Sequence, residues 1–260
     1  YSLFRGLDLR IFGDRLPCAK IEIKLLFRIK IYKYMKILLF GATGRLGQIF
    51  LDEALIDGHV ITAICRTPSD LDYIKSPSLF VVHGDAENLA DIEDVFKNQD
   101  VIISCLADNL FPNKTVFVYS KFMNSAINYI KKYDITRVIV CTSDGTDPTR
   151  REEAPELVRT MVFPIILPLL NDMSIMEATL INTDVKFTVV RVVGLNEESA
   201  TYDYLTEPFW DITKMAWSIS REDVAYFLIE CLNTDIYDRK IITIASKIKN
   251  TDGFNLSRHM

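Results

Sequence analysis

The sequence predicts an α/β fold, a doubly wound parallel sheet that forms a single domain. Near-continuous apolar runs alternate with amphipathic stretches of helical length, which is the pattern of parallel strands covered by helices on both faces. A glycine-rich heptapeptide, Gly41–Gly47, separates the first apolar run from the first amphipathic stretch. The 260 residues are enough for one large α/β domain and too few for two.

The predicted strands are continuous apolar runs rather than alternating ones. They are Ile37–Phe40, Val60–Cys65, Leu79–Val82, Val101–Cys105, Val138–Cys141, Phe187–Val192 and Ile241–Ala245. Apolar residues at helical spacing predict helices between them, over Leu46–Asp57, Leu89–Phe96, Val116–Tyr133 and Arg221–Leu232. Ser220 is predicted to cap the last of these helices.

The two ends of the chain differ from this pattern. Residues 1–34 carry eight lysines or arginines against three acids, whereas the remainder carries 22 against 32. We interpret residues 1–34 as an extension outside the functional domain, with a targeting peptide or an extra strand or hairpin at Ile21–Lys24 as alternatives. We expect the nucleotide-binding domain, with a small substrate cap, over residues 35–245, and a polar tail over 246–260.

An apolar run with two prolines, Met161–Leu170, breaks the alternation of strands and helices. Proline disrupts helices, and an apolar segment of this length is too short to cross a membrane. The run is compatible with a lid or pocket wall, with a contact to a second subunit, or with the protein core. We therefore expect no membrane association and either a monomer or a dimer.

The composition excludes several classes of function. The acidic body of the chain argues against a nucleic-acid partner. The five cysteines, Cys18, Cys65, Cys105, Cys141 and Cys231, are scattered without a C-x-x-C pair, and the three histidines show no metal-ligand spacing. The sequence therefore predicts no disulfide framework and no metal site, and indicates a reducing, cytoplasmic compartment.

The three glycines of the heptapeptide each have a physical reason to lack a side chain. Gly41 permits a tight turn, Gly44 lets a phosphate approach the backbone, and Gly47 lets the following helix pack closely against the strand. The positive end of that helix would then face an anion, most often a dinucleotide pyrophosphate, as in Rossmann-like folds. The predicted cofactor-binding residues here are Gly41, Thr43, Gly44, Arg45, Leu46 and Gly47. An ordinary structural turn is the alternative.

The residues that follow each strand are further candidates, because ligands of open α/β sheets lie across the carboxyl ends of the strands. Arg66 follows the second strand, where a basic side chain accommodates the 2′-phosphate of NADP(H) and an acid would favour NAD. Arg45 is expected to assist, and a solvated surface arginine is the alternative interpretation of Arg66. The other strand-end residues predicted to border the cofactor are Asp85, Ala86, Leu106, Ala107 and Thr142.

Five short motifs occur along the predicted domain. They are Gly-Ala-Thr-Gly-Arg-Leu-Gly at 41–47, Cys65-Arg66, His83-Gly84-Asp85, Asp100-Val101-Ile102-Ile103 and Val140-Cys141-Thr142-Ser143. Together they resemble the atypical short-chain dehydrogenases/reductases with an NmrA-like NAD(P)H-binding domain, and are most similar to the flavin and biliverdin reductases of that group. The resemblance implies hydride transfer from NADPH to a flat acceptor such as a flavin, tetrapyrrole or quinone. It also implies that Ser143 is the active-site serine, with a turn residue as the alternative.

The sequence departs from that family at two places. Ordinary short-chain dehydrogenases carry a Tyr-x-x-x-Lys pair for proton exchange with a carbonyl, and Leu170 and Ser174 stand at those positions. The segment Val192–Leu195 replaces a proline pair and a histidine of the biliverdin enzymes. Two functions follow, an NADPH-dependent reductase or a regulatory protein that senses NAD(P) with little catalysis. Aromatic residues between Thr201 and Trp217 are candidates for stacking on a flat acceptor.

Overall fold

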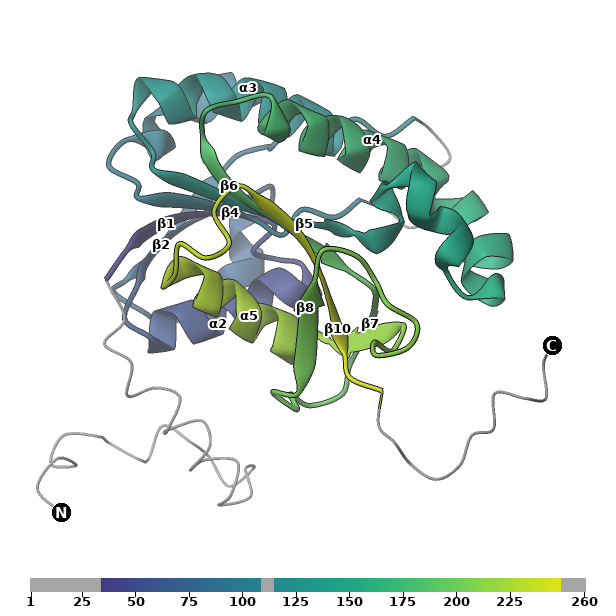
Figure 1. The fold of residues 1–260 in the computed structure, drawn as a ribbon. Coiled ribbons are helices and arrows are strands. Elements are labelled where there is room, and N and C mark those ends of the chain that lie inside the picture. Colours follow the sequence, from purple (N-terminus) through teal and green to yellow (C-terminus); the bar gives the residue numbers. More distant parts are fainter. Residues whose placement is uncertain (1–33, 109–114, 249–260) are drawn as a thin grey trace, which may run out of the picture. The chain divides into compact units, whose positions relative to one another are not determined.

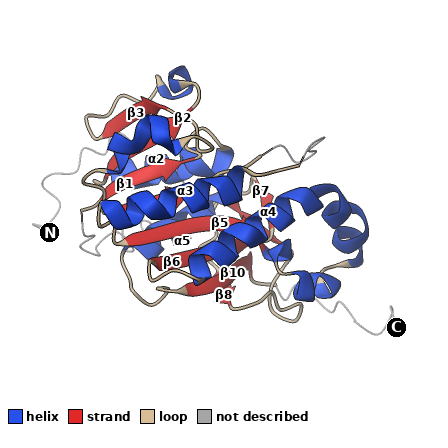
Figure 2. Ribbon diagram, turned by 90° about the horizontal axis from the view of Figure 1, so that it is seen from above, coloured by secondary structure: helices blue, strands red, loops and turns tan. Residues whose placement is uncertain are grey.

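One eight-stranded sheet, with helices on both faces, organises the computed structural model (Figures 1 and 2). The structure describes residues 34–108 and 115–248. Across the sheet the strands are β3 (Leu79–His83), β2 (Val60–Cys65), β1 (Lys36–Phe40), β4 (Val101–Ser104), β5 (Arg137–Ser143), β6 (Lys186–Val192), β10 (Lys240–Ser246) and β8 (Tyr204–Glu207). All of them run parallel except β8, which pairs antiparallel with β10. The predicted doubly wound parallel sheet is confirmed, and each predicted strand is present.

Helices cover both faces of the sheet, which is why its central strands are apolar on both sides. In Figure 1, α3 (Val118–Lys132) and α4 (Phe163–Ile181) lie on one face, and α2 (Arg45–Ile56) and α5 (Arg221–Leu232) lie on the other. Alternate residues of one strand enter each core. Leu38 of β1, for example, belongs to the cluster beneath α3 and α4.

Two helix predictions need different comments. The predicted cap of α5 is confirmed, because the Ser220 side chain accepts a hydrogen bond from the Asp223 amide. The stretch Leu89–Phe96 is not an α-helix but a 3₁₀ segment, η3, with non-helical backbone angles at Ile92. Its sequence has the apolar spacing of a helix, but the backbone turns at Ile92 so that the segment ends after two short turns.

The prolines of the Met161–Leu170 run do not interrupt the structure, which corrects the prediction. A π-helical turn, Val158–Val162, runs directly into α4. Pro164 lies in the first turn of α4, where proline is tolerated, and Pro168 removes one further hydrogen bond without ending the helix.

The continuous helix Val158–Ile181 also changes the statement about membranes. It has 24 residues and a mean hydropathy of 1.4, so by length and composition alone it could cross a membrane. Leu169, Leu170 and Met176 are buried against the sheet, as in the core helix of a globular domain. Such a helix is weak grounds for a membrane segment, because buried core helices pass the same test.

Three short strands and part of the tail were missed. β7 (Gly194–Asn196) pairs with β9 (Ser218–Ser220) in a small second sheet, and β8 forms within the aromatic-rich segment. The predicted tail begins too early, since Ser246 ends β10 and Lys247 forms a bridge with Met215. Residues 249–260 and 1–33, and with them most of the predicted extension and tail, lie outside the described residues.

The strand order reverses between β1 and β4. From β1 the chain winds outward through β2 and β3, and it then returns to β4 on the other side of β1. The connections on the two sides of this point diverge, which leaves a crevice outside the carboxyl ends of β1 and β4.

Candidate functional site

A pocket of about 220 Å³ opens at this reversal point. The ends of β1, β2, β3 and β4 and the start of α3 form its walls. Its lining residues are Phe40, Gly41, Thr43, Gly44, Ile64, Cys65, Arg66, Gly84, Asp85, Ala86, Glu87, Cys105, Leu106, Ala107, Asp108 and Val118. Of the predicted cofactor residues, the structure brings together here Gly41, Thr43, Gly44, Arg66, Asp85, Ala86, Leu106 and Ala107.

The glycine loop is shaped by contacts that exclude side chains. Gly41 has a φ of +83°, and a Cβ there would lie 2.4 Å from the carbonyl oxygen of Cys105 at the end of β4. A Cβ on Gly47 would lie 2.0 Å from the Gly41 carbonyl oxygen. Gly44 donates its amide to the same oxygen at 3.1 Å and faces the pocket. The loop therefore holds the start of α2 directly against β1.

The start of α2 suits an anion. Its N-cap, Gly44, supplies no side-chain hydrogen bond, and the first turn contains no acidic residue. At α5, by contrast, Ser220 caps the helix and Glu222 and Asp223 lie in the first turn. Since the first N–H groups of a helix need acceptors and carry partial positive charge, the α2 terminus can accept a phosphate that α5 has no place for.

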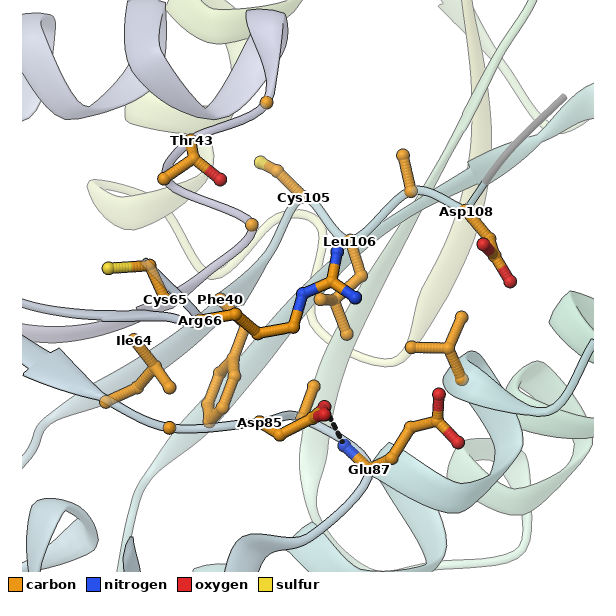
Figure 3. Close-up of a pocket in the computed structure, with 16 residues that line it drawn as sticks. Phe40, Thr43, Ile64, Cys65, Arg66, Asp85, Glu87, Cys105, Leu106 and Asp108 are labelled. Carbon is orange, nitrogen blue, oxygen red and sulfur yellow. Dashed lines mark hydrogen bonds between the residues drawn. The ribbon is translucent and has the colours of Figure 1, made fainter. Parts of the chain in front are cut away.

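Arg66 supplies the cationic side chain of this pocket. Figure 3 shows it extending from the end of β2 across the pocket toward Leu106. Within the described residues no carboxylate lies within 4.0 Å of Arg66, so its charge is available. The acids nearby have other contacts: Asp85 accepts the Glu87 amide at 2.9 Å, and Glu87 pairs with Lys121 at 3.1 Å.

Together these features fit a dinucleotide phosphate. A side-chain-free cradle, an uncapped helix terminus and an unpaired arginine converge on one crevice. Comparison with known families then gives a match over residues 41–235, to the family described as NAD(P)H-binding. The chain belongs to this family.

Solved structures show how widely this NAD(P)H-binding fold recurs. An anaerobilin reductase from Escherichia coli gives a TM-score of 0.67 and 18% identity, covering 84% of this chain and 99% of that one. A short-chain dehydrogenase/reductase from Veillonella parvula, in complex with NADP, gives 0.65 and 18%, covering 82% and 95%. An oxidoreductase from Lactococcus lactis gives 0.66 and 20%, covering 82% and 91%. At these identities the similarity establishes the fold.

Four predicted cofactor residues do not line the pocket of this NAD(P)H-binding domain. Leu46 and Gly47 are buried in the first turn of α2, where they pack the loop. Arg45 points to solvent and pairs with Glu197 at 2.9 Å. Thr142 faces α4 and donates its hydroxyl to Glu177 Oε1 at 2.7 Å. Whether these residues contact a bound cofactor stays a prediction.

Several lining residues were not predicted. They come from strand ends assigned to the core or from the turns just beyond, namely Phe40, Ile64, Cys65, Gly84, Glu87, Cys105, Asp108 and Val118. Gly84 has a steric signal, since a Cβ there would lie 2.9 Å from the Ile92 side chain. The Cys105 thiol is no candidate nucleophile, because a hydrogen bond with Cys141 and burial hold its pKa well above the usual value.

Ser143 ends β5, beyond the pocket but at the same edge of the sheet. It pairs with Val192 of β6, and the preceding pair, Thr142 and Arg191, leads into a buried charged cluster. Arg191 contacts Glu177 of α4 at 2.7 Å and Asp147 at 3.6 Å.

Asp144, next to Ser143, completes the turn after β5. It accepts the Thr243 hydroxyl at 2.6 Å, and burial raises the pKa of its carboxyl group. The turn that carries Ser143 is therefore fixed on both sides of the serine by hydrogen bonds, from Thr142 to α4 and from Asp144 to β10.

Proposed function

We propose that this protein is an NADPH-dependent reductase that passes a hydride to a flat, conjugated acceptor such as a flavin or a linear tetrapyrrole. The observation that carries the proposal is the unpaired Arg66 at the end of β2, beside the glycine loop. A guanidinium at this place suits the 2′-phosphate that distinguishes NADP(H) from NAD(H). The start of α2 would hold the pyrophosphate.

The chain's own residues have a binding and orienting role in this proposal. Bound NADPH supplies the hydride. Ser143 places a hydroxyl at the end of β5, where it can hydrogen-bond to the nicotinamide or to the acceptor. Leu170, which is fully buried, and Ser174 occupy the positions of the missing Tyr-x-x-x-Lys pair. An acceptor whose reduction needs little acid catalysis therefore fits this site better than an alcohol or a sugar does.

The aromatic residues of the cap divide into two groups. Trp210 is buried and donates its indole N–H to the Met215 carbonyl, so it belongs to the core. Phe209 is 48% exposed and lies at the surface of the same segment. Phe209 is thus the aromatic side chain of this pair that is open to stacking. The tetrapyrrole named for the anaerobilin reductase of this fold supports the choice of a flat acceptor.

The test is steady-state oxidation of NADPH and NADH in the presence of FMN, riboflavin, biliverdin or a quinone. We expect turnover with NADPH and at least one of these acceptors. In Ser143→Ala we expect lower turnover with unchanged NADPH affinity, because the hydroxyl lies at the reacting end and not at the phosphates. No turnover above the uncatalysed rate with any acceptor would contradict the proposal.

A regulatory protein that senses NAD(P) is the second candidate function. The missing Tyr-x-x-x-Lys pair, replaced by Leu170 and Ser174, favours it. Calorimetric binding of NADP⁺ without turnover, together with a protein partner whose affinity changes when NADP⁺ binds, would select this function. A partner whose affinity ignores the cofactor would exclude it.

A further inference from the structure

Arg151, in the 3₁₀ segment η5 (Pro148–Glu153), lacks a carboxylate partner. Its Nε donates to the Gly145 carbonyl oxygen at 2.7 Å, which holds the side chain against the turn that follows Ser143. Its Nη2 is buried and has no hydrogen-bond acceptor in the part of the chain that the structure describes. Among the same residues, no acid lies within 4.0 Å of its guanidinium.

This arrangement differs from that of the neighbouring arginines. Arg150 pairs with Glu153, Arg159 pairs with Glu152 at 3.3 Å, and Arg191 pairs with Glu177. Burial lowers the pKa of Arg151, and Asp147 opposes this only through its longer-range charge. Asp147 is in turn engaged by Arg191 and by the Thr149 amide and hydroxyl.

A guanidinium held in this way needs an acceptor. A buried N–H without a partner costs free energy, and a charged one costs more than a neutral one. Water or an anionic ligand can supply the acceptor, and the planar guanidinium fork matches the oxygens of a carboxylate or a phosphate.

The surroundings of Arg151 suit one part of the proposed acceptor. Its contact with Gly145 places it two residues from Ser143, at the reacting edge of the sheet. The adjacent Arg150 guanidinium lies over the ring of Phe209, 4.6 Å from its centroid, so an exposed aromatic face and a second cation flank the same segment. An aromatic surface beside an unpaired cation fits a flat molecule that carries an acidic substituent.

We propose that Arg151 binds the anionic substituent of the acceptor and makes the enzyme selective for acceptors with a phosphate or carboxylate. The inference rests on the proposed function, because it assumes a flat acceptor next to Ser143. Arg66 and Arg151 then divide the two anionic ligands between them: Arg66 holds the cofactor phosphate, and Arg151 holds the acceptor.

FMN and riboflavin provide the test, since they share the same ring and differ in the phosphate. Each is titrated by fluorescence quenching into protein saturated with NADP⁺, which keeps Arg66 occupied. We expect the wild type to bind FMN about tenfold more tightly than riboflavin. Arg151→Gln should lose this preference by weakening FMN alone, and Arg151→Lys should retain part of it.

Biliverdin and its dimethyl ester, titrated in the same way, test the carboxylate. Preference for the charged member of either pair, lost in Arg151→Gln, supports the proposal. Arg159→Gln is the matched control, because it removes one positive charge from the same region while its partner Glu152 is exposed. It should leave the preference intact.

Three results would overturn the inference. They are equal binding of both members of both pairs, equal weakening of both by Arg151→Gln, and the same effect from Arg159→Gln. The second would assign Arg151 a structural role through Gly145 and leave water as the partner of Nη2. Because binding is measured without turnover, a failure of the reductase proposal is seen separately, in NADPH oxidation.

Discussion

At the residue scale, the close contact between Gly41 and Gly47 is the part of the site with the least tolerance. A Cβ on Gly47 would lie 2.0 Å from the Gly41 carbonyl oxygen, and both positions are backbone, so no side chain can move aside. The sequence alone predicted this contact, because strand, glycine turn and helix occur in immediate succession. Local chain geometry is sufficient to explain it.

Gly47→Ala should therefore separate the start of α2 from β1. We expect a loss of about 1–3 kcal/mol in the free energy of unfolding and loss of NADP⁺ binding. Urea denaturation and calorimetry measure the two effects.

Gly58→Ala, at the other end of α2, is the matched control. Gly58 has a φ of +85° with no neighbour within 4 Å of a Cβ, so strain of about 1 kcal/mol is expected without any effect on NADP⁺. Normal NADP⁺ binding by Gly47→Ala would show that the close packing does not shape the site.

The direction of Thr142 shows what residue-level reading missed. Its place after Cys141 suggested the cofactor, but it shares the strand parity of Val138 and Val140, which pack beneath α3 and α4. Counting in steps of two would have placed its side chain toward α4. Its partner Glu177 lies 35 residues away, and no local pattern predicts that hydrogen bond.

At the element scale, α4 is attached to the sheet by one buried ion pair. Glu177 of α4 contacts Arg191 of β6 and accepts the Thr142 hydroxyl of β5, and the Glu177 and Arg191 side chains are only 4% and 9% exposed. Such a contact fixes where α4 lies over the ends of β5 and β6. The sequence did not predict it, since it saw only the prolines of the helix and expected an interruption.

Glu177→Ala should be strongly destabilising, because it leaves the Arg191 charge buried with only the more distant Asp147. We expect a loss of about 3 kcal/mol in unfolding free energy, read from the urea midpoint. Glu197→Ala breaks the exposed pair with Arg45 and serves as the comparison. A loss no larger than that of Glu197→Ala would show that the buried pair does not hold α4.

The short strands β7, β8 and β9 mark the limit of prediction at this scale. β7 and β9 have three residues each and lie about 24 positions apart, so their pairing depends on the fold around them. Apolar periodicity needs longer segments to be recognised. Strands such as β1 and β5 were predictable because they are buried on both faces.

At the scale of the whole molecule, the order of elements predicted the sheet, and the sheet placed the pocket. Alternating strands and helices of this length favour a doubly wound sheet, and the ligand crevice of such a sheet lies where the strand order reverses. The pocket between the ends of β1 and β4 follows from this topology. The identity of an acceptor does not, because it depends on side chains of the cap such as Arg151 and Phe209, whose positions come from non-local packing.

The central claim is that this pocket binds NADP(H) in preference to NAD(H) through Arg66. Its most direct test is calorimetric titration of NADP⁺ and NAD⁺ into the wild type and Arg66→Ala. We predict tighter binding of NADP⁺ by the wild type, and a roughly tenfold to hundredfold loss of NADP⁺ affinity in Arg66→Ala with little change for NAD⁺. Equal affinities of the wild type for both cofactors, or equal losses of both in the variant, would contradict it.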